Sequence, residues 1–178
     1  MRDQLSIWTI GHSTLSIEDF IVRLQSFAIA RLIDVRSFPG SRRYPHFNKE
    51  NLSTDLTDAA IRYEHLRELG GRRRPRPDSI NIAWRNDSFR GYADFMETNE
   101  FRDGVERLIE FASKQRVAIM CSEAVWWRCH RSMISDYLKV KGIDVRHIMA
   151  EGKAEPHPFT PVARVVDGEL SYRGVLSE

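Results

Sequence analysis

Short apolar runs alternate with longer amphipathic segments along this chain, and the two patterns predict different secondary structure. Runs rich in Ile, Val and Leu predict strands, and their apolar centres indicate burial on both faces of a sheet. The predicted strands cover residues 5–10, 30–37, 116–121 and 143–150, and residues 62–69 form a short strand or an extended segment. Helical spacing of apolar residues predicts a helix that begins after Ser16, and further helices over residues 48–61, 99–114 and 129–142.

The remaining segments carry turn residues or no regular pattern. Prolines and glycines make loops of residues 38–47 and 70–79, and residues 80–97 are ambiguous. Residues 151–161 form a connector, and Asp167-Gly168 predicts a small C-terminal β-hairpin over residues 162–172. Strands that alternate with helices predict a single α/β domain, with a mostly parallel sheet flanked by helices in a Rossmann-like three-layer arrangement. We expect this domain to cover residues 1–150, and the extension 151–178 to pack its hairpin on the same domain.

Composition adds an expected location. The 178 residues are 42% apolar and 29% charged, as in globular soluble proteins, and no apolar run approaches the ~20 residues that cross a bilayer. Because the N-terminus lacks the apolar core and cleavage site of a signal peptide, we expect a cytoplasmic protein with no membrane partner. In a reducing compartment the two cysteines are expected to be free thiols or ligands rather than a disulfide scaffold.

The net charge of +2 hides an uneven distribution of arginine. Residues 36–90 carry eleven Arg and one Lys against seven acids, a net charge of +5, and the rest of the chain carries −3. Of the 27 basic residues 22 are Arg, whose guanidinium binds phosphate and carboxylate groups bidentately. Genomic base composition would explain the overall bias toward arginine, but the clustering favours an anionic ligand.

Four groups of polar residues follow predicted strands and should share one edge of the sheet. They are GHS after the first strand, DVRSFPGSRRYP at the second, LGGRRRPRPD after the third extended segment and CSEAVWWRCHR after VAIM. In open α/β sheets, ligands bind outside the carboxyl ends of the strands. The convergence of these four groups therefore predicts a functional site at that edge.

In the last group, the two cysteines have different predicted settings. Cys121 closes a strand near the carboxylate of Glu123, which disfavours a thiolate, so it is interpreted as a quiet buried thiol that borders the substrate. Cys129 lies at the predicted start of a helix among cationic residues, which favour a thiolate. The same turn, with His130 and Arg131, would also hold a phosphate or carboxylate. Cys129 is thus either a nucleophile or a packing thiol, and anion binding is the favoured function of this turn.

The first two strands end in further candidate residues. His12 and Ser13 follow a strand and a glycine, which suits substrate contact, and His12 could serve acid–base chemistry near neutral pH or simply hold the turn. Arg36 lies near the carboxyl end of its strand and is a candidate anion ligand. Asp34 points the same way along the strand, and is either the partner of Arg36 or a buried acid bonded to backbone.

The arginine-rich loops combine cations with aromatic rings, which suits phosphate contact together with base stacking. Glycines in the second loop permit close approach of backbone to a ligand. Tyr63 or Trp84 would stack on a ring of the substrate, although aromatic residues also fill cores. A solvated, flexible loop is the alternative interpretation of the arginines. The candidate substrate contacts from these loops are Arg42, Arg43, Gly70, Gly71 and Arg72.

The sequence motifs support a metal or cofactor site less than they support an anion-binding site. Cys121, Cys129 and His130 are soft ligands, but C-x7-C-H lacks the tight C-x2-C pairing common in zinc sites, so a metal centre is kept as an alternative only. The G-x-G-x-x-G and P-loop motifs are both absent, and no cofactor is expected. The spacing also departs from the H-C-x5-R of cysteine-dependent phosphatases, because Met120 precedes Cys121 and the arginine comes one position late at Arg128.

Several long motifs in order resemble a known family. TIGHS, LIDVRSFPGSRRYPHFN, YEHLRELGGRRRPRPDS, WRNDSFRGYADFM, MCSEAVWWRCHRSMI and GIDVRHI together resemble the bacterial and archaeal domain-of-unknown-function family 488, from about residue 8 to residue 150. The resemblance implies an α/β fold and a single cytoplasmic domain, and it implies no established activity. Its motifs fall on His12, Ser13, Asp34, Arg36, Pro39, Tyr63, Leu69, Gly70, Gly71, Cys121, Glu123, Cys129, His130 and Arg131.

These observations favour a cofactor-free enzyme, a hydrolase or transferase, that acts on a phosphorylated, nucleotide-like or nucleic-acid substrate. Glu123 and His12 would provide acid–base chemistry, with Cys129 as the candidate nucleophile. Phosphate would be held by the arginines and by the start of the helix at 129–142. The alternatives are a non-catalytic nucleic-acid-binding module that uses the arginine-rich loops, disfavoured by the low net charge, and a metal-dependent enzyme with Cys and His ligands.

Overall fold

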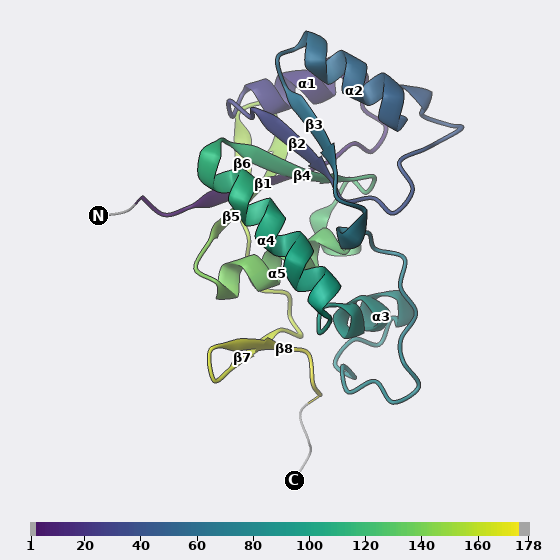
Figure 1. Ribbon diagram of the computed structural model, residues 1–178, viewed down its shortest axis with the longest axis vertical. Helices are drawn as coiled ribbons and strands as arrows, with labels where there is room; N and C mark the ends of the chain where they lie inside the picture. The colour runs from purple at the N-terminus through teal and green to yellow at the C-terminus, as the bar shows by residue number, and fades with distance from the viewer. Residues whose placement is uncertain (1–2, 175–178) are drawn as a thin grey trace.

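The computed structural model describes residues 3–174 as a six-stranded sheet with helices packed on both faces (Figure 1). The strand order is β3-β2-β4-β1-β5-β6, in which β1 to β5 run parallel and β6 is antiparallel to β5. The strands are β1 (Ser6–Gly11), β2 (Arg31–Asp34), β3 (Arg62–His65), β4 (Val117–Cys121), β5 (Asp144–Ala150) and β6 (Lys153–Pro156). A separate hairpin joins β7 (Arg164–Val166) to β8 (Glu169–Ser171).

Alternate residues of the buried strands face two separate hydrophobic clusters, so the sheet is the middle of three layers. Ile7 and Ile119 lie in one cluster, whereas the neighbouring Trp8 and Met120 lie in the other. Helices α1 (Ile17–Gln25) and α2 (Lys49–Asp58) cover the second face, and α3 (Asp87–Phe95), α4 (Asn99–Lys114) and α5 (Arg131–Val140) cover the first (Figure 1). The predicted three-layer α/β arrangement and the C-terminal hairpin are confirmed.

Local sequence signals explain where the long helices begin. Ser16 caps α1 by accepting a hydrogen bond from the backbone amide of Asp19, as the sequence predicted. Thr98 caps α4 in the same way through Phe101, and the helix covers 99–114 as expected. The ambiguous segment 80–97 contains α3, whose N-cap Asn86 accepts from two backbone amides of the first turn.

Several predicted elements differ from the structure. The strand predicted over 30–37 ends at Asp34, and the helix predicted over 48–61 ends at Asp58. The segment 62–69 is a strand only to His65, because Leu66 and Leu69 turn inward through a 3-10 turn at Arg67–Leu69. The helix predicted at 129–142 begins two residues later, since Cys129 is extended. The connector 151–161 contains β6, which joins the main sheet by backbone pairing with β5 and has no apolar alternation to signal it.

The register of the central strands brings their carboxyl ends to one edge. Gly11 at the end of β1 lies beside Cys121 at the end of β4, and Asp34 at the end of β2 lies beside Met120. The segments that follow these strands therefore start as neighbours, as the order of polar groups predicted. No helix within residues 3–174 is long and apolar enough to cross a membrane.

Candidate functional site

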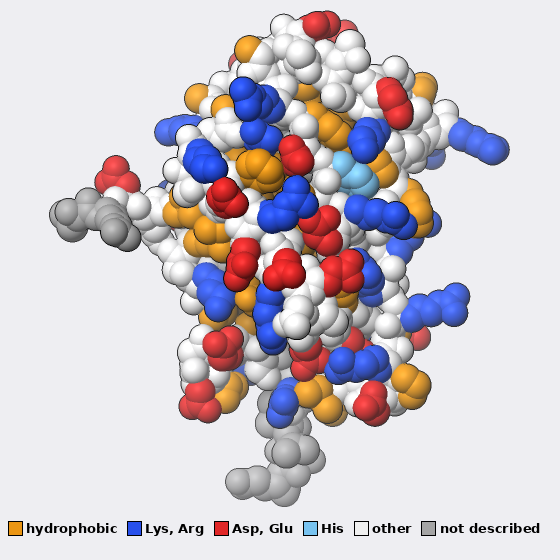
Figure 2. Space-filling model, in the orientation of Figure 1, with side chains coloured by type: hydrophobic (Ala, Val, Ile, Leu, Met, Phe, Trp, Pro, Cys, Tyr) orange, Lys and Arg blue, Asp and Glu red, His pale blue; other side chains and the backbone are white. Residues whose placement is uncertain are grey.

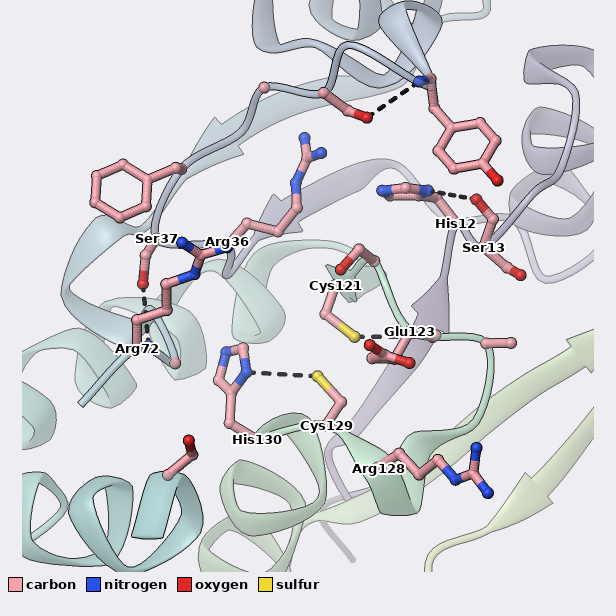
Figure 3. A pocket seen from close by; sticks show the side chains of 18 of the residues that line it. His12, Ser13, Arg36, Ser37, Arg72, Cys121, Glu123, Arg128, Cys129 and His130 are labelled. Atoms are coloured by element: carbon pink, nitrogen blue, oxygen red, sulfur yellow. Dashed lines mark hydrogen bonds between the residues drawn. The ribbon is translucent and has the colours of Figure 1, made fainter. Parts of the chain in front are cut away.

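A cavity of about 1160 Å³ opens at this carboxyl edge, and five segments line it (Figure 3). Residues 12–14 follow β1, residues 36–44 follow β2, and residues 121–130 follow β4. The loop 71–74 and the start of α3 complete the wall. In Figure 3, Ser37 and Arg72 lie on one side of the pocket, His12 lies on the opposite side, and the thiols of Cys121 and Cys129 lie between them.

The structure brings ten of the sixteen sequence-predicted site residues together in this pocket. Those that line it are His12, Ser13, Arg36, Arg43, Gly71, Arg72, Cys121, Glu123, Cys129 and His130. Six others lie outside its lining, namely Asp34, Arg42, Tyr63, Gly70, Trp84 and Arg131. The surroundings of each of these six residues explain why it does not line the pocket.

Asp34 is fully buried and serves Arg36 rather than the cavity. The Nε and Nη2 atoms of Arg36 donate to the two carboxylate oxygens of Asp34 at 2.9 and 2.8 Å, and Nη2 also donates to the carbonyl of Phe47 at 2.8 Å. Tyr63 donates its hydroxyl to the same carboxylate, so its ring is held away from the pocket. Arg36 therefore borders the cavity with its charge already paired.

Arg131 is only 1% exposed, and its guanidinium points into the protein. Its Nη1 atom donates to the hydroxyl of Thr9 at 3.1 Å, and its Nη2 atom donates to the carbonyl of Glu123 at 2.9 Å. The expected role of Arg131 as a direct anion ligand does not fit this placement. Arg131 instead anchors the loop after β4 to strand β1, and Trp126 of the same loop is held by stacking on His147, with ring centroids 4.6 Å apart.

The other residues outside the lining have ordinary packing roles. The ring of Trp84 packs on Phe89 and Tyr172, with centroids 5.0 and 5.5 Å apart, so it is not presented to a ligand. A Cβ atom on Gly70 would collide with Ser37, which means that the absent side chain makes room for the protein itself. Arg42 is exposed beyond the pocket wall.

The two thiols meet at the pocket and differ in acidity. Burial raises the pKa of Cys121 well above that of an ordinary thiol, and its hydrogen bond with Cys129 adds to this effect. Burial alone would also raise the pKa of Cys129, but the hydrogen bond with Cys121 and the charge of Arg131 outweigh it and lower that pKa. Cys129 is therefore the thiol that ionises first, and Cys121 is the neutral donor beside it.

His130 is fixed beside the Cys129 thiol. Its Nε2 atom lies 2.9 Å from the carbonyl of Val35, and its Nδ1 atom lies 3.4 Å from the Sγ atom of Cys129. Burial lowers the pKa of His130, which favours the neutral ring with the proton on Nε2 and Nδ1 free to accept. Gly71 is required for this placement, because a Cβ atom there would overlap the imidazole.

His12 contributes a neutral imidazole ring to the cavity, and Glu123 contributes an exposed carboxylate. The ring of His12 stacks on Phe47 with centroids 4.3 Å apart, and its Nδ1 atom is 2.9 Å from the carbonyl of Ser13. Burial lowers the pKa of His12 to about 4, and the charge of Arg36 adds to this, so the ring is neutral at pH 7. Glu123 is exposed, and its carboxylate is open to a ligand.

The electrostatic character of the pocket follows from its arginines. Six arginines line it against a single acid, Glu123, among the described residues. Four of them are exposed and take part in none of the ion pairs found within residues 3–174. These four are Arg43, Arg72, Arg74 and Arg128; of the two others, Arg36 is paired with Asp34, and Arg73 donates to the carbonyl of Gly70 and lies over the ring of Phe95. Such an excess of unpaired guanidinium groups attracts anions.

Sequence reasoning missed several lining residues. Arg73 and Arg74 belong to the arginine-rich loop that was singled out, so their motif did signal them. Phe38 also lies in a loop that was singled out, although it was not chosen there, whereas Ser88 and Phe89 fell in the ambiguous segment 80–97. The lining residues not predicted as site residues are Thr14, Ser37, Phe38, Gly40, Ser41, Tyr44, Arg73, Arg74, Ser88, Phe89, Ser122, Ala124 and Arg128.

The expected alternative of a metal centre lacks a suitable arrangement of ligands. Within residues 3–174, no group of three or more His, Cys, Asp or Glu side chains is placed to hold a metal ion. Cys121, Cys129 and His130 lie close together, but one ring nitrogen of His130 is engaged with the Val35 carbonyl and the other faces Cys129. The three residues therefore form a hydrogen-bonded thiol site rather than a ligand set.

The fold and the pocket define an α/β domain with a cationic, thiol-containing cavity at the carboxyl edge of its sheet. The family model of the domain of unknown function DUF488 matches residues 16–138. The match covers more than half of the chain, and the protein therefore belongs to the DUF488 family, as its motifs predicted. Comparison with curated proteins and with solved structures gives no match.

Proposed function

We propose that this protein is an enzyme, a hydrolase or transferase, that binds a small phosphorylated, nucleotide-like substrate in the pocket at the carboxyl edge of the sheet. The observation that carries the proposal is the charge of the lining, in which four exposed, unpaired arginines face one carboxylate around a thiol of lowered pKa. Guanidinium groups bind phosphate oxygens bidentately, whereas a neutral ligand would leave these positive charges without a negative partner.

The substrate is proposed to carry a ring as well as phosphate. Phe38 lines the pocket and is 63% exposed, so its ring is available to stack on a ligand. The guanidinium carbon of Arg72 lies 5.7 Å from the centre of its ring. A base stacked on Phe38 would leave its phosphate among the arginines of the same wall. The volume of about 1160 Å³ accommodates a nucleotide.

The chemical groups suggest a covalent route. After passing its proton to the Nδ1 atom of His130, the Cys129 thiolate would attack the electrophilic centre of the substrate. The bond from that centre to the leaving group would break, and His130 would return the proton to the leaving group. The exposed carboxylate of Glu123 would then take a proton from the water or alcohol that releases the product. His12 is neutral at pH 7 because of its lowered pKa, so it would orient the substrate through hydrogen bonds rather than through charge.

Binding is tested by titration calorimetry with nucleoside mono-, di- and triphosphates and with the matching nucleosides. We expect phosphorylated ligands to bind and nucleosides not to, and we expect Arg43→Ala and Arg72→Ala each to weaken binding about tenfold. Arg42→Ala is the matched control, since Arg42 is adjacent in sequence but outside the lining, and it should bind as the wild type does. Equal losses in Arg42→Ala and Arg43→Ala, or equal binding of nucleosides, would contradict the proposal.

Turnover is tested on the ligands that bind, by following product formation chromatographically. Cys129→Ser should abolish turnover and keep ligand affinity within about threefold, because the thiol is proposed to react rather than to hold phosphate. Unchanged turnover in Cys129→Ser would remove Cys129 from the mechanism. Turnover lost in Arg43→Ala at saturating ligand, with affinity intact, would contradict the binding role of that arginine.

Nucleic-acid binding without catalysis makes a different prediction. The face covered by α4 carries basic and acidic side chains side by side (Figure 2), so it offers no broad cationic surface for a duplex. A nucleic-acid-binding module would bind longer single strands progressively better and lose affinity steeply with salt. If affinity instead stays constant from a mononucleotide to an oligonucleotide, the pocket holds a single nucleotide as proposed.

A further inference from the structure

The two cysteines of the chain come from different segments, yet their thiols lie together in the pocket. Cys121 ends the central strand β4, and Cys129 precedes α5. Both line the cavity, and their sulfur atoms point toward each other between His130 and Glu123 (Figure 3). Each thiol lies close enough to the other to shift its pKa. The chain has no other cysteine, so any thiol chemistry must use this pair.

The surroundings of the two thiols make Cys129 easier to ionise than Cys121. Cys129 faces the Nδ1 atom of His130 at 3.4 Å, which can accept its proton, and lies within the field of Arg131. Cys121 contacts the backbone carbonyl of Glu123 at 3.9 Å, a neighbour that stabilises the protonated thiol. Cys129 is therefore the nucleophilic thiol, and Cys121 beside it stays protonated.

We propose that Cys129 and Cys121 form a two-thiol exchange centre that reduces a small anionic disulfide bound in the pocket. The Cys129 thiolate attacks one sulfur of the disulfide R–S–S–R, forms a Cys129–S–S–R mixed disulfide and releases the first RS⁻. Cys121 then gives its proton to solvent and attacks the Sγ atom of Cys129; the mixed S–S bond breaks and the second RS⁻ is released. The substrate gains two electrons, and the protein ends with a Cys121–Cys129 disulfide.

The pocket selects the charge of this substrate. Four exposed, unpaired arginines surround the thiols against the single carboxylate of Glu123, so carboxylate groups on R would be attracted and cationic groups repelled. This inference goes beyond the proposed function, because it concerns thiol exchange and requires no phosphorylated substrate. It can fail while phosphate binding stands, and it can hold where no nucleotide binds.

The test uses DTNB, an anionic aromatic disulfide that releases the coloured thiolate TNB, with intact-mass spectrometry of the products. Wild-type protein should release two TNB per chain and lose the mass of two hydrogens, with no adduct retained. Cys121→Ser should release one TNB and keep one as a stable adduct on Cys129. Cys129→Ser should react at least about tenfold more slowly than Cys121→Ser, because its remaining thiol is the protonated one. Two retained adducts on the wild type, or equal rates for the two serine variants, would overturn the proposal.

Controls separate chemistry from folding and from charge. Each serine variant is paired with the alanine variant, and circular dichroism reports whether it is folded; the comparison uses whichever variant retains the native spectrum. After unfolding in guanidinium, either single variant should release one TNB at the rate of free cysteine. Arg72→Ala should slow the reaction with DTNB but not with neutral dithiodipyridine, each rate being divided by that for free cysteine. Equal slowing with both reagents would overturn the charge selection.

Discussion

The Sγ atom of Cys129 lies 3.4 Å from the Nδ1 atom of His130, the residue that follows it in the chain. The other ring nitrogen of His130 is 2.9 Å from the carbonyl of Val35, which is best satisfied by a proton on that nitrogen. The nitrogen that faces the thiol is then the acceptor. A thiol proton has a defined destination, and the chemistry proposed for the pocket depends on this pairing.

The acidity of Cys129 is open to direct measurement. We expect alkylation of Cys129 by iodoacetamide to become half-maximal below the ordinary thiol pKa of about 8.5, because its pKa is lowered by Cys121 and Arg131. Cys121 should need a higher pH, since burial raises its pKa. Peptide mass spectrometry over a pH series separates the two sites. A single shared profile would show that the pocket does not distinguish its thiols.

Gly71 should be intolerant of a side chain. A Cβ atom there overlaps His130, so Gly71→Ala should displace the imidazole and lower the free energy of unfolding by about 1–3 kcal/mol. Gly40→Ala is the matched control in the same pocket, because a Cβ atom at Gly40 meets nothing within 4 Å. Urea unfolding measures both variants, and equal effects would show that the close approach of Gly71 and His130 has no energetic consequence.

Substitution of Arg131 should destabilise the protein, whereas substitution of Arg72 should affect ligand binding alone. Arg131→Met would remove the guanidinium donor from the buried hydroxyl of Thr9 and from the carbonyl of Glu123, which should cost about 1–3 kcal/mol of stability. Arg72 is exposed and in no ion pair among the described residues, so Arg72→Ala should change stability by less than about 0.5 kcal/mol. Chemical denaturation distinguishes them. A stable Arg131→Met protein that fails to bind anions would make Arg131 a ligand after all.

Acid should destabilise the protein through its buried histidines. Burial lowers the pKa of His12 to about 4 and that of His147 to about 2, compared with about 6.5 in an unfolded chain. Below pH 6.5 the unfolded chain takes up protons that the folded protein does not, so the stabilisation present above pH 6.5 is progressively lost. Each histidine should then cost about 2 kcal/mol between pH 7.5 and pH 5.

The variant His12→Gln tests this linkage. Its stability at pH 7.5 is expected to be lower, because the stack on Phe47 is lost, but the fall between pH 7.5 and pH 5 should be smaller than in the wild type by about 2 kcal/mol. Urea unfolding at the two pH values gives both differences. An identical pH dependence would mean that His12 is protonated equally in the folded and unfolded states.

Much of the fold was accessible from the sequence, because the chain signals it locally. The apolar runs of β1, β4 and β5 and the capping of α1 by Ser16 have short-range causes. The order of the elements also predicted that the polar segments meet at the carboxyl edge of the sheet, where the pocket lies. Strand β6 could not be predicted, since it is held by backbone pairing to β5 rather than by an apolar pattern.

The sequence predicted which segments form the candidate site, but it did not predict the directions in which their side chains point. Position along the chain placed Arg131 beside Cys129, but only the folded structure shows that the guanidinium turns inward to Thr9. The same limit applies to the two cysteines. The sequence pattern assigned Cys121 to the end of a strand and Cys129 to the start of a helix, whereas the loop between them returns and places both thiols in one pocket.

A crystal structure of the protein grown with the tightest-binding nucleotide of the calorimetric series tests the central claim most directly. We predict that the phosphate lies in the pocket within hydrogen-bonding distance of at least two of the exposed arginines Arg43, Arg72, Arg74 and Arg128, with Cys129 facing the ligand. A nucleotide bound elsewhere on the molecule, with its phosphate contacting none of these arginines, would contradict the account.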